Sequence, residues 1–146
     1  MKAEFRKYFR DIGIQEPLEE RIKAVHEFFS EICQDKIEDV FVNEYVKEDG
    51  SREFVSVRFL SKNYSMLAAD FISKDDFRFG MVRKIRNFRL QKKDFDLKKA
   101  TEKSRMTIEL MYAEAPRVRS SYRASGVNCD YLMKIFHKYI IPNLKV

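Results

Sequence analysis

Alternation of side chains with a period of two, between Ile37 and Tyr112, is the feature that most constrains how this chain folds. In 40–46 and again in 54–59, the even-numbered residues form one set of side chains and the odd-numbered residues form another. The polar stretch Lys47-Glu48-Asp49-Gly50 lies between the two segments. A β-strand points successive side chains to opposite faces, and Asp-Gly supplies the positive φ that a tight hairpin turn needs. This part of the chain therefore predicts a β-hairpin.

Later segments continue the alternation and predict more strands, at 64–71, 77–82 and 106–112. Periodicity does not separate strand from helix between Arg83 and Arg105, but the short connections of a meander favour a strand at 85–91 and a loop through Lys92-Lys93-Asp94. Residues 113–127 contain Pro116, Gly126, three arginines and three serines. We predict an exposed connection there.

Helical spacing of apolar residues lies on both sides of this region. Phe5, Tyr8 and Phe9 predict a helix over 2–12 that ends at Gly13. Pro17 suits the first turn of a second helix, whose apolar stripe runs from Leu18 to Ile32. A third helix is expected to begin at Asn128 as N-cap and to end at Pro142, with an apolar stripe that covers the sheet.

These elements predict a single α+β domain over 1–146. It has two N-terminal helices, an antiparallel meander of five to seven strands and a C-terminal capping helix. The layout is similar to partly closed pleckstrin-homology-like barrels and to helix-grip folds. A resemblance of layout carries no function.

Composition predicts a soluble, cytoplasmic protein that folds without a metal or cofactor. Hydrophobic residues make up 45% of the 146, which supplies a core. The two cysteines, Cys33 and Cys129, have no metal-ligand spacing and are expected to be reduced thiols. No apolar run approaches the ~20 residues that span a bilayer, and the N-terminus does not read as a secretion signal.

Charge is concentrated in one part of the chain. Residues 1–77 carry 12 basic and 17 acidic residues, whereas 78–105 carry 11 basic and three acidic residues. A concentrated basic surface attracts polyanions, because it displaces counterions from phosphates and raises encounter rates. The candidate anion-binding residues are Arg78, Arg83, Lys84, Arg86, Arg89, Lys92, Lys93 and Arg105, extended by Arg117, Arg119 and Arg123.

Aromatic residues lie among these charges, at Phe79, Phe88, Phe95 and Tyr122. Exposed rings stack on nucleic-acid bases, but rings in strands more often belong to the core. The sequence favours the core for these four.

Catalytic and metal-binding interpretations are weaker. His26 and His137 have no partner at metal-ligand spacing. Asp70, Asp75 and Asp76 resemble a carboxylate cluster, but the last two fit a hairpin turn better. A phosphate-binding or phosphorylated Ser120-Ser121 is outweighed by a plain surface loop.

We therefore expect a non-catalytic binding module that engages nucleic acid or an acidic protein through its basic surface in 78–105. The acidic half of a second copy, giving a homo-oligomer, is a competing partner. One alternative is a membrane-surface module that binds anionic lipid headgroups. Another is a small-ligand carrier or enzyme with its site between the sheet and the last helix.

Overall fold

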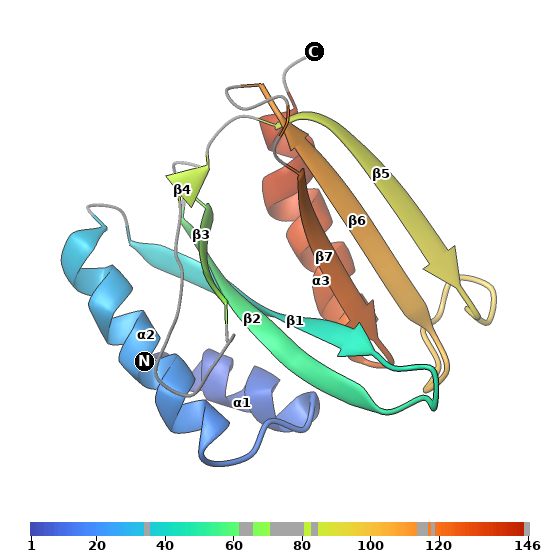
Figure 1. Cartoon of the computed structure of the whole chain (residues 1–146), viewed down its shortest axis with the longest axis horizontal. Helices are drawn as coiled ribbons and strands as arrows, with labels where there is room; N and C mark the ends of the chain where they lie inside the picture. The colour runs from blue at the N-terminus through green and yellow to red at the C-terminus, as the bar shows by residue number, and fades with distance from the viewer. Residues whose placement is uncertain are drawn as a thin grey trace.

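The computed structural model describes residues 1–33, 36–61, 66–70, 81–82, 85–113, 117 and 119–144 (Figure 1). Two helices come first, α1 (Ala3–Asp11) and α2 (Leu18–Ile32). The first sheet has the order β1-β2-β3-β4, with β1 (Ile37–Val46), β2 (Arg52–Ser61), β3 (Met66–Asp70) and β4 (Met81–Val82). The second sheet has the order β5-β6-β7, with β5 (Ile85–Lys93), β6 (Arg105–Tyr112) and β7 (Arg119–Ser125).

The chain closes with α3 (Asn128–Ile135), which continues through a π-helical turn (Phe136–Ile140) and a 3₁₀ turn (Ile141–Asn143). The α+β class is confirmed, and the strand pairs that the structure describes are antiparallel. The predicted single meander is instead divided into two sheets. Period-two alternation shows which residues share a face, but it does not show which strands are neighbours.

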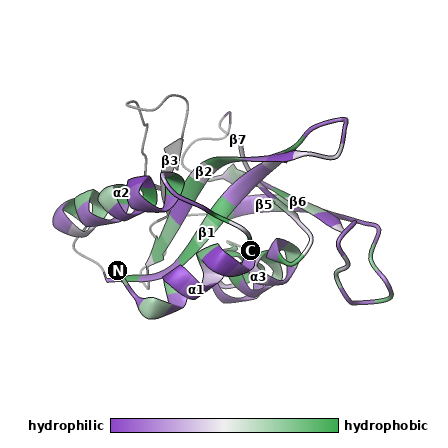
Figure 2. Ribbon diagram, turned by 90° about the horizontal axis from the view of Figure 1, so that it is seen from below, coloured by the Kyte–Doolittle hydropathy of each residue, from purple (hydrophilic) through white to green (hydrophobic). Residues whose placement is uncertain are grey.

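The N-terminal helices cover one face of the first sheet. Helix α1 buries Phe5, Tyr8 and Phe9, and α2 buries Ile22, Val25 and Phe29. These side chains form one core with Val40, Val42, Val57 and Phe59. Figure 2 shows hydrophobic residues along β1 and β2 where these strands approach the helices. Gly13, at φ +86°, ends α1 in the left-handed conformation that glycine adopts most easily.

A second core lies between the two sheets and α3. Phe41 and Leu60 from the first sheet meet Ile108 and Leu110 of β6 there, beneath Leu132 of α3. The Phe41 ring stacks on that of Tyr122 in β7, with centroids 5.6 Å apart. The C-terminal helix thus packs as a cap over the second sheet.

The prediction of an exposed connection at 113–127 was wrong, because residues 119–125 form β7. Tyr122 and Ala124 are buried, and Ser120 lies on the same side of the strand. Serine and arginine at all the other positions of the strand hide this alternation. The predicted strand at 85–91 is confirmed and extends to Lys93. The expected strand residues 64–65, 71 and 77–80 lie outside the described residues.

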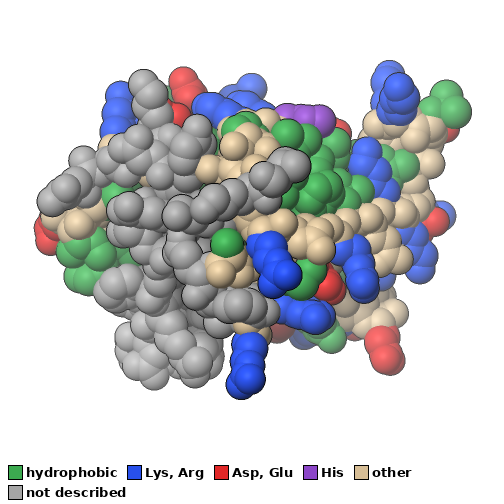
Figure 3. All heavy atoms as spheres, turned by 90° about the horizontal axis from the view of Figure 1, so that it is seen from above, with side chains coloured by type: hydrophobic (Ala, Val, Ile, Leu, Met, Phe, Trp, Pro, Cys, Tyr) green, Lys and Arg blue, Asp and Glu red, His purple; other side chains and the backbone are tan. Residues whose placement is uncertain are grey.

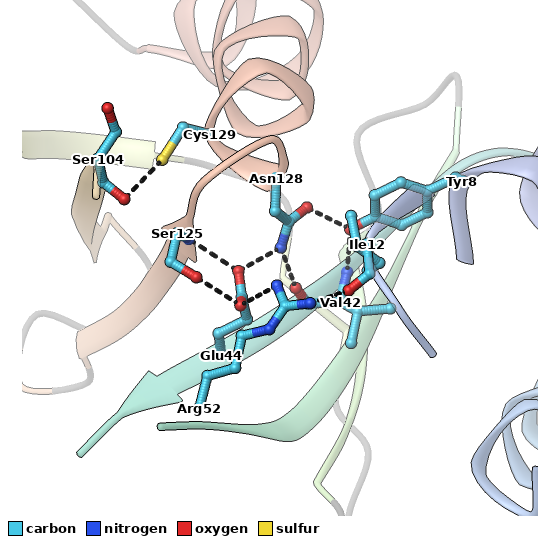
Figure 4. A network of polar contacts seen from close by, with 9 residues as sticks. All are labelled: Tyr8, Ile12, Val42, Glu44, Arg52, Ser104, Ser125, Asn128 and Cys129. Carbon is cyan, nitrogen blue, oxygen red and sulfur yellow. Dashed lines mark hydrogen bonds and ion pairs between the residues drawn. The ribbon is translucent and has the colours of Figure 1, made fainter. Parts of the chain in front are cut away.

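Asn128 begins α3 as predicted, but it does not cap the helix. Its side chain is fully buried and turned away from the helix (Figure 4). The amide nitrogen donates to the Val42 carbonyl (3.0 Å) and to the Glu44 carboxylate (2.8 Å). The amide oxygen accepts a 2.7 Å hydrogen bond from the Tyr8 hydroxyl, and that hydroxyl accepts the Val42 N–H at 2.8 Å.

Glu44 is fully buried at the centre of this network. Its carboxylate also accepts hydrogen bonds from Arg52 Nη1 at 2.9 Å and from the backbone N–H and hydroxyl of Ser125, each at 2.8 Å. Arg52 donates in turn to the Ile12 carbonyl. Burying an ionised carboxylate is costly unless it is paired and hydrogen-bonded, and Glu44 meets both conditions. The network connects α1, β1, β2, β7 and α3.

We expect Glu44→Gln to destabilise the fold by about 2–3 kcal/mol, because an amide cannot accept all of these hydrogen bonds and leaves buried donors unpaired. Glu53→Gln is the matched control, since Glu53 pairs with Lys47 on the surface at 3.2 Å. Loss of an exposed pair should cost at most ~1 kcal/mol. Urea unfolding of the two variants measures the difference, and equal destabilisation would contradict the role given to Glu44.

Candidate anion-binding face

Strand register gathers basic residues on the outer side of the second sheet. One face of β6 is buried, through Met106, Ile108, Leu110 and Tyr112. The cross-strand rows of the other face are Lys93–Arg105–Ser125, Gln91–Thr107–Arg123, Arg89–Glu109–Ser121 and Asn87–Met111–Arg119. We call this surface the outer basic face. Its five cations are all exposed: Arg89, Lys93, Arg105, Arg119 and Arg123.

The other predicted residues are placed differently. Arg86 is exposed at the irregularity that interrupts the β5–β6 register. Lys92 lies on the α3 side of β5, with its ammonium 5.1 Å from the centre of the Phe95 ring. Arg117 is exposed shortly before β7. Arg78, Arg83 and Lys84 lie outside the described residues.

The charges of the outer basic face are poorly balanced within the protein. Glu109, opposite Arg89, is the one acidic residue in the four rows. Lys93 lies directly opposite Arg105, an arrangement of like charges that destabilises a sheet. Arg123, opposite Thr107, is a diagonal neighbour of both Arg105 and Glu109. Among the described residues no carboxylate forms an ion pair with these five cations; the pairs of Lys47, Arg52 and Lys138 lie elsewhere.

The described aromatic residues of the prediction do not lie on this face. Tyr122 is fully buried, and Phe88 and Phe95 are partly buried against the second core, between the sheets and α3. Phe79 lies outside the described residues. The basic face therefore offers charge and hydrogen-bond donors, but among the described residues none of these predicted rings is placed to stack on bases.

A further cation, which the sequence did not single out, lies between the sheets. The Arg58 guanidinium sits 4.4 Å from the centre of the Tyr122 ring, and its Nη2 donates to the Ser121 carbonyl at 3.1 Å. Burial raises the pKa of Tyr122 well above its ordinary value, although the charge of Arg58 acts in the opposite direction. Arg58 stabilises the contact between β2 and β7 and points away from the outer basic face.

An open cleft of about 1040 Å³ lies between the β1–β2 turn, the β5–β6 loop and the start of α3. Its charged lining is evenly divided, with three basic residues and three acidic ones: Arg52, Lys103, Arg105, Asp94, Glu102 and Asp130. This balance gives the cleft no preference for anions. The outer basic face is therefore the better candidate.

The histidine and carboxylate candidates form no metal site among the described residues, where no group of three or more His, Cys, Asp or Glu could hold a metal ion. His26 packs edge-on against Phe5 and Phe59, and burial lowers its pKa. His137 is exposed after α3. Asp70 ends β3, while Asp75 and Asp76 lie outside the described residues. Ser120 and Ser121 are half-buried in β7.

Comparison with known proteins found no match: no family model, curated protein or solved structure matches the chain. Within the described residues, the helices are too short or too polar to cross a membrane.

Both cysteines are free thiols, in different surroundings. Cys129 is fully buried in α3, its sulfur 3.7 Å from the Ser104 carbonyl, and burial raises the pKa of its thiol to about 12. Cys33 is half-buried at the end of α2.

We expect one thiol of the native protein to react with a disulfide reagent at neutral pH, because the thiolate is the reactive form. Cys33→Ser should abolish that reaction, and Cys129 should react only after unfolding in urea. Rapid labelling of Cys129 in the native protein, seen by mass spectrometry, would contradict its placement in the core.

Proposed function

We propose that this protein is a non-catalytic binding module that engages an anionic macromolecule through the outer basic face. The observation that carries the proposal is the strand register, which brings cations from three strands to one surface with a single carboxylate among them. The module would act by electrostatic recognition, with guanidinium groups that hydrogen-bond carboxylates or phosphates.

The arrangement of Lys93, Arg105 and Arg123 supports this proposal energetically. Like charges on neighbouring strands repel one another in the free protein. A bound anion relieves that repulsion in addition to forming its own contacts. The relief of repulsion therefore adds to the binding free energy of an anionic partner. Simple solubility needs no such clustering, because mixed charges serve it equally well.

We also propose the pleckstrin-homology-like layout over the helix-grip one. Two antiparallel sheets with a C-terminal helix packed on the second support it. This resemblance concerns layout, and the functional proposal rests on the face itself.

The test is binding of fluorescently labelled duplex DNA and of polyglutamate, followed by anisotropy at low and at physiological salt. Arg105→Glu combined with Arg123→Glu should weaken binding of both probes by roughly tenfold or more, because the removed contacts release counterions. The thermal midpoint should change little, since both side chains are exposed and Arg105 lies opposite a like charge, that of Lys93.

The matched control is Arg6→Glu combined with Lys7→Glu on α1, which makes the same change in net charge at exposed positions. Equal weakening by the two double variants would assign binding to overall charge and overturn the proposal. Binding of anionic vesicles alone, with neither polymer bound, would overturn the proposal in favour of the membrane-surface alternative.

A further inference from the structure

Strand β5 forms the outer edge of the second sheet. It pairs with β6 along its length, and no described strand pairs with its other side (Figure 1). An isolated parallel bridge between Ile85 and Leu144 occupies only its first residue. Among the described residues, the edge thus has a strand partner only at one end, and the rest of the nine-residue strand has none.

One hydrogen bond shows which backbone groups point outward. The Phe88 N–H is bound at 2.8 Å by the side-chain oxygen of its neighbour Asn87, so it does not point toward β6. Residues of an antiparallel strand alternate between facing the partner strand and facing away from it. Leu90 and Lys92 therefore present their backbone N–H and C=O groups to the outside as Phe88 does.

The two sides of this edge differ in chemistry. On the α3 side, Phe88 and Leu90 are half-buried, and the Phe88 ring lies 5.1 Å from that of Phe136. Met133 of α3 is also only partly buried. Figure 3 shows hydrophobic side chains gathered on this side of the molecule, with Lys and Arg beside them. On the other side, Arg89 and Lys93 belong to the outer basic face.

We propose that the β5 edge binds an extended acidic peptide by strand addition, with apolar side chains toward α3 and acidic side chains beside Arg89 and Lys93. Backbone hydrogen bonds would supply affinity, and alternation of the peptide would supply specificity. This inference rests on the proposed function and names the partner of the basic face as a protein segment. It requires the peptide to replace Asn87 as the acceptor for the Phe88 N–H.

Charge excludes a second copy of β5 as the occupant. The strand carries Arg86, Arg89, Lys92 and Lys93 and no acidic residue. Pairing two such strands would bring like charges together across the new ladder, which is destabilising. An acidic strand has the opposite effect, so the same residues disfavour self-association and favour the proposed partner.

The first experiment uses a labelled peptide of nine residues, the length of β5, in which Glu alternates with Val. Two further versions are N-methylated at every Val or at every Glu, which removes backbone donors and leaves the charge unchanged. In antiparallel addition the residues opposite Phe88, Leu90 and Lys92 exchange backbone bonds with them, and these carry the Val side chains. Methylation at Val should then weaken binding by roughly tenfold or more, and methylation at Glu much less.

The reverse order of the two methylated peptides would indicate parallel addition, which also supports the proposal. Equal affinity for all three peptides would overturn it, because binding would then need no backbone ladder. In that case weakening by the Arg105→Glu and Arg123→Glu variant would leave the proposed function standing. Loss of that sensitivity as well would overturn both.

The protein side is tested with Lys92→Pro against Lys92→Ala. Proline removes an outward N–H that β6 does not use, and edge strands tolerate it there. Both variants remove the same charge, so Lys92→Pro should bind the peptide roughly fivefold or more weakly than Lys92→Ala. Equal binding by two variants with the same thermal midpoint would count against strand addition. If the proline variant does not fold, the methylated peptides decide the question.

Discussion

The fold depends on how Asn43 and Glu44 join two sheets that share no backbone ladder. β1 and β7 are each at an edge of their own sheet, and an unpaired edge leaves backbone groups that need partners. The Asn43 amide donates to the Ser121 carbonyl at 2.8 Å and accepts the Arg123 N–H at 2.5 Å. The Glu44 carboxylate accepts a hydrogen bond from the N–H of Ser125, two residues further along β7. Side chains of β1 thus satisfy the β7 edge and fix its position.

That junction also explains why the arginines of the chain have different roles. Arg52 is held by Glu44, and Arg58 is stacked on Tyr122, so both charges are used inside the fold. With β7 fixed by its backbone, the side chains of Arg119 and Arg123 are left on the outside, beside those of β6. Arg52 is paired and Arg58 is held against a ring inside the fold, whereas the external cations remain available to a partner.

The sequence predicted elements better than their arrangement. Helices and most strands follow from apolar spacing, but β7 was missed because only Tyr122 and Ala124 mark its buried face. One signal of the junction was present: Glu44 stands where the alternation of Val40, Val42 and Val46 requires an apolar residue. Its four hydrogen-bond donors come from β2, β7 and α3, and local sequence does not show such distant partners. Likewise, the charge counts along the sequence show the basic segment. Only the strand register shows which of its cations lie on each face of β5.

Basic residues on an edge strand have a second explanation, since lysine and arginine protect exposed edges from aggregation. Protection accounts for Arg89 and Lys93 on β5. It does not account for Arg105, which lies on the central strand of the sheet, or for Arg119 and Arg123, whose strand is already covered by β1. None of these three cations guards an edge, and Arg105 lies directly opposite the protective Lys93, which is unfavourable. A surface built only to prevent self-association would lack them, so the charge on β6 and β7 is better explained by an anionic partner.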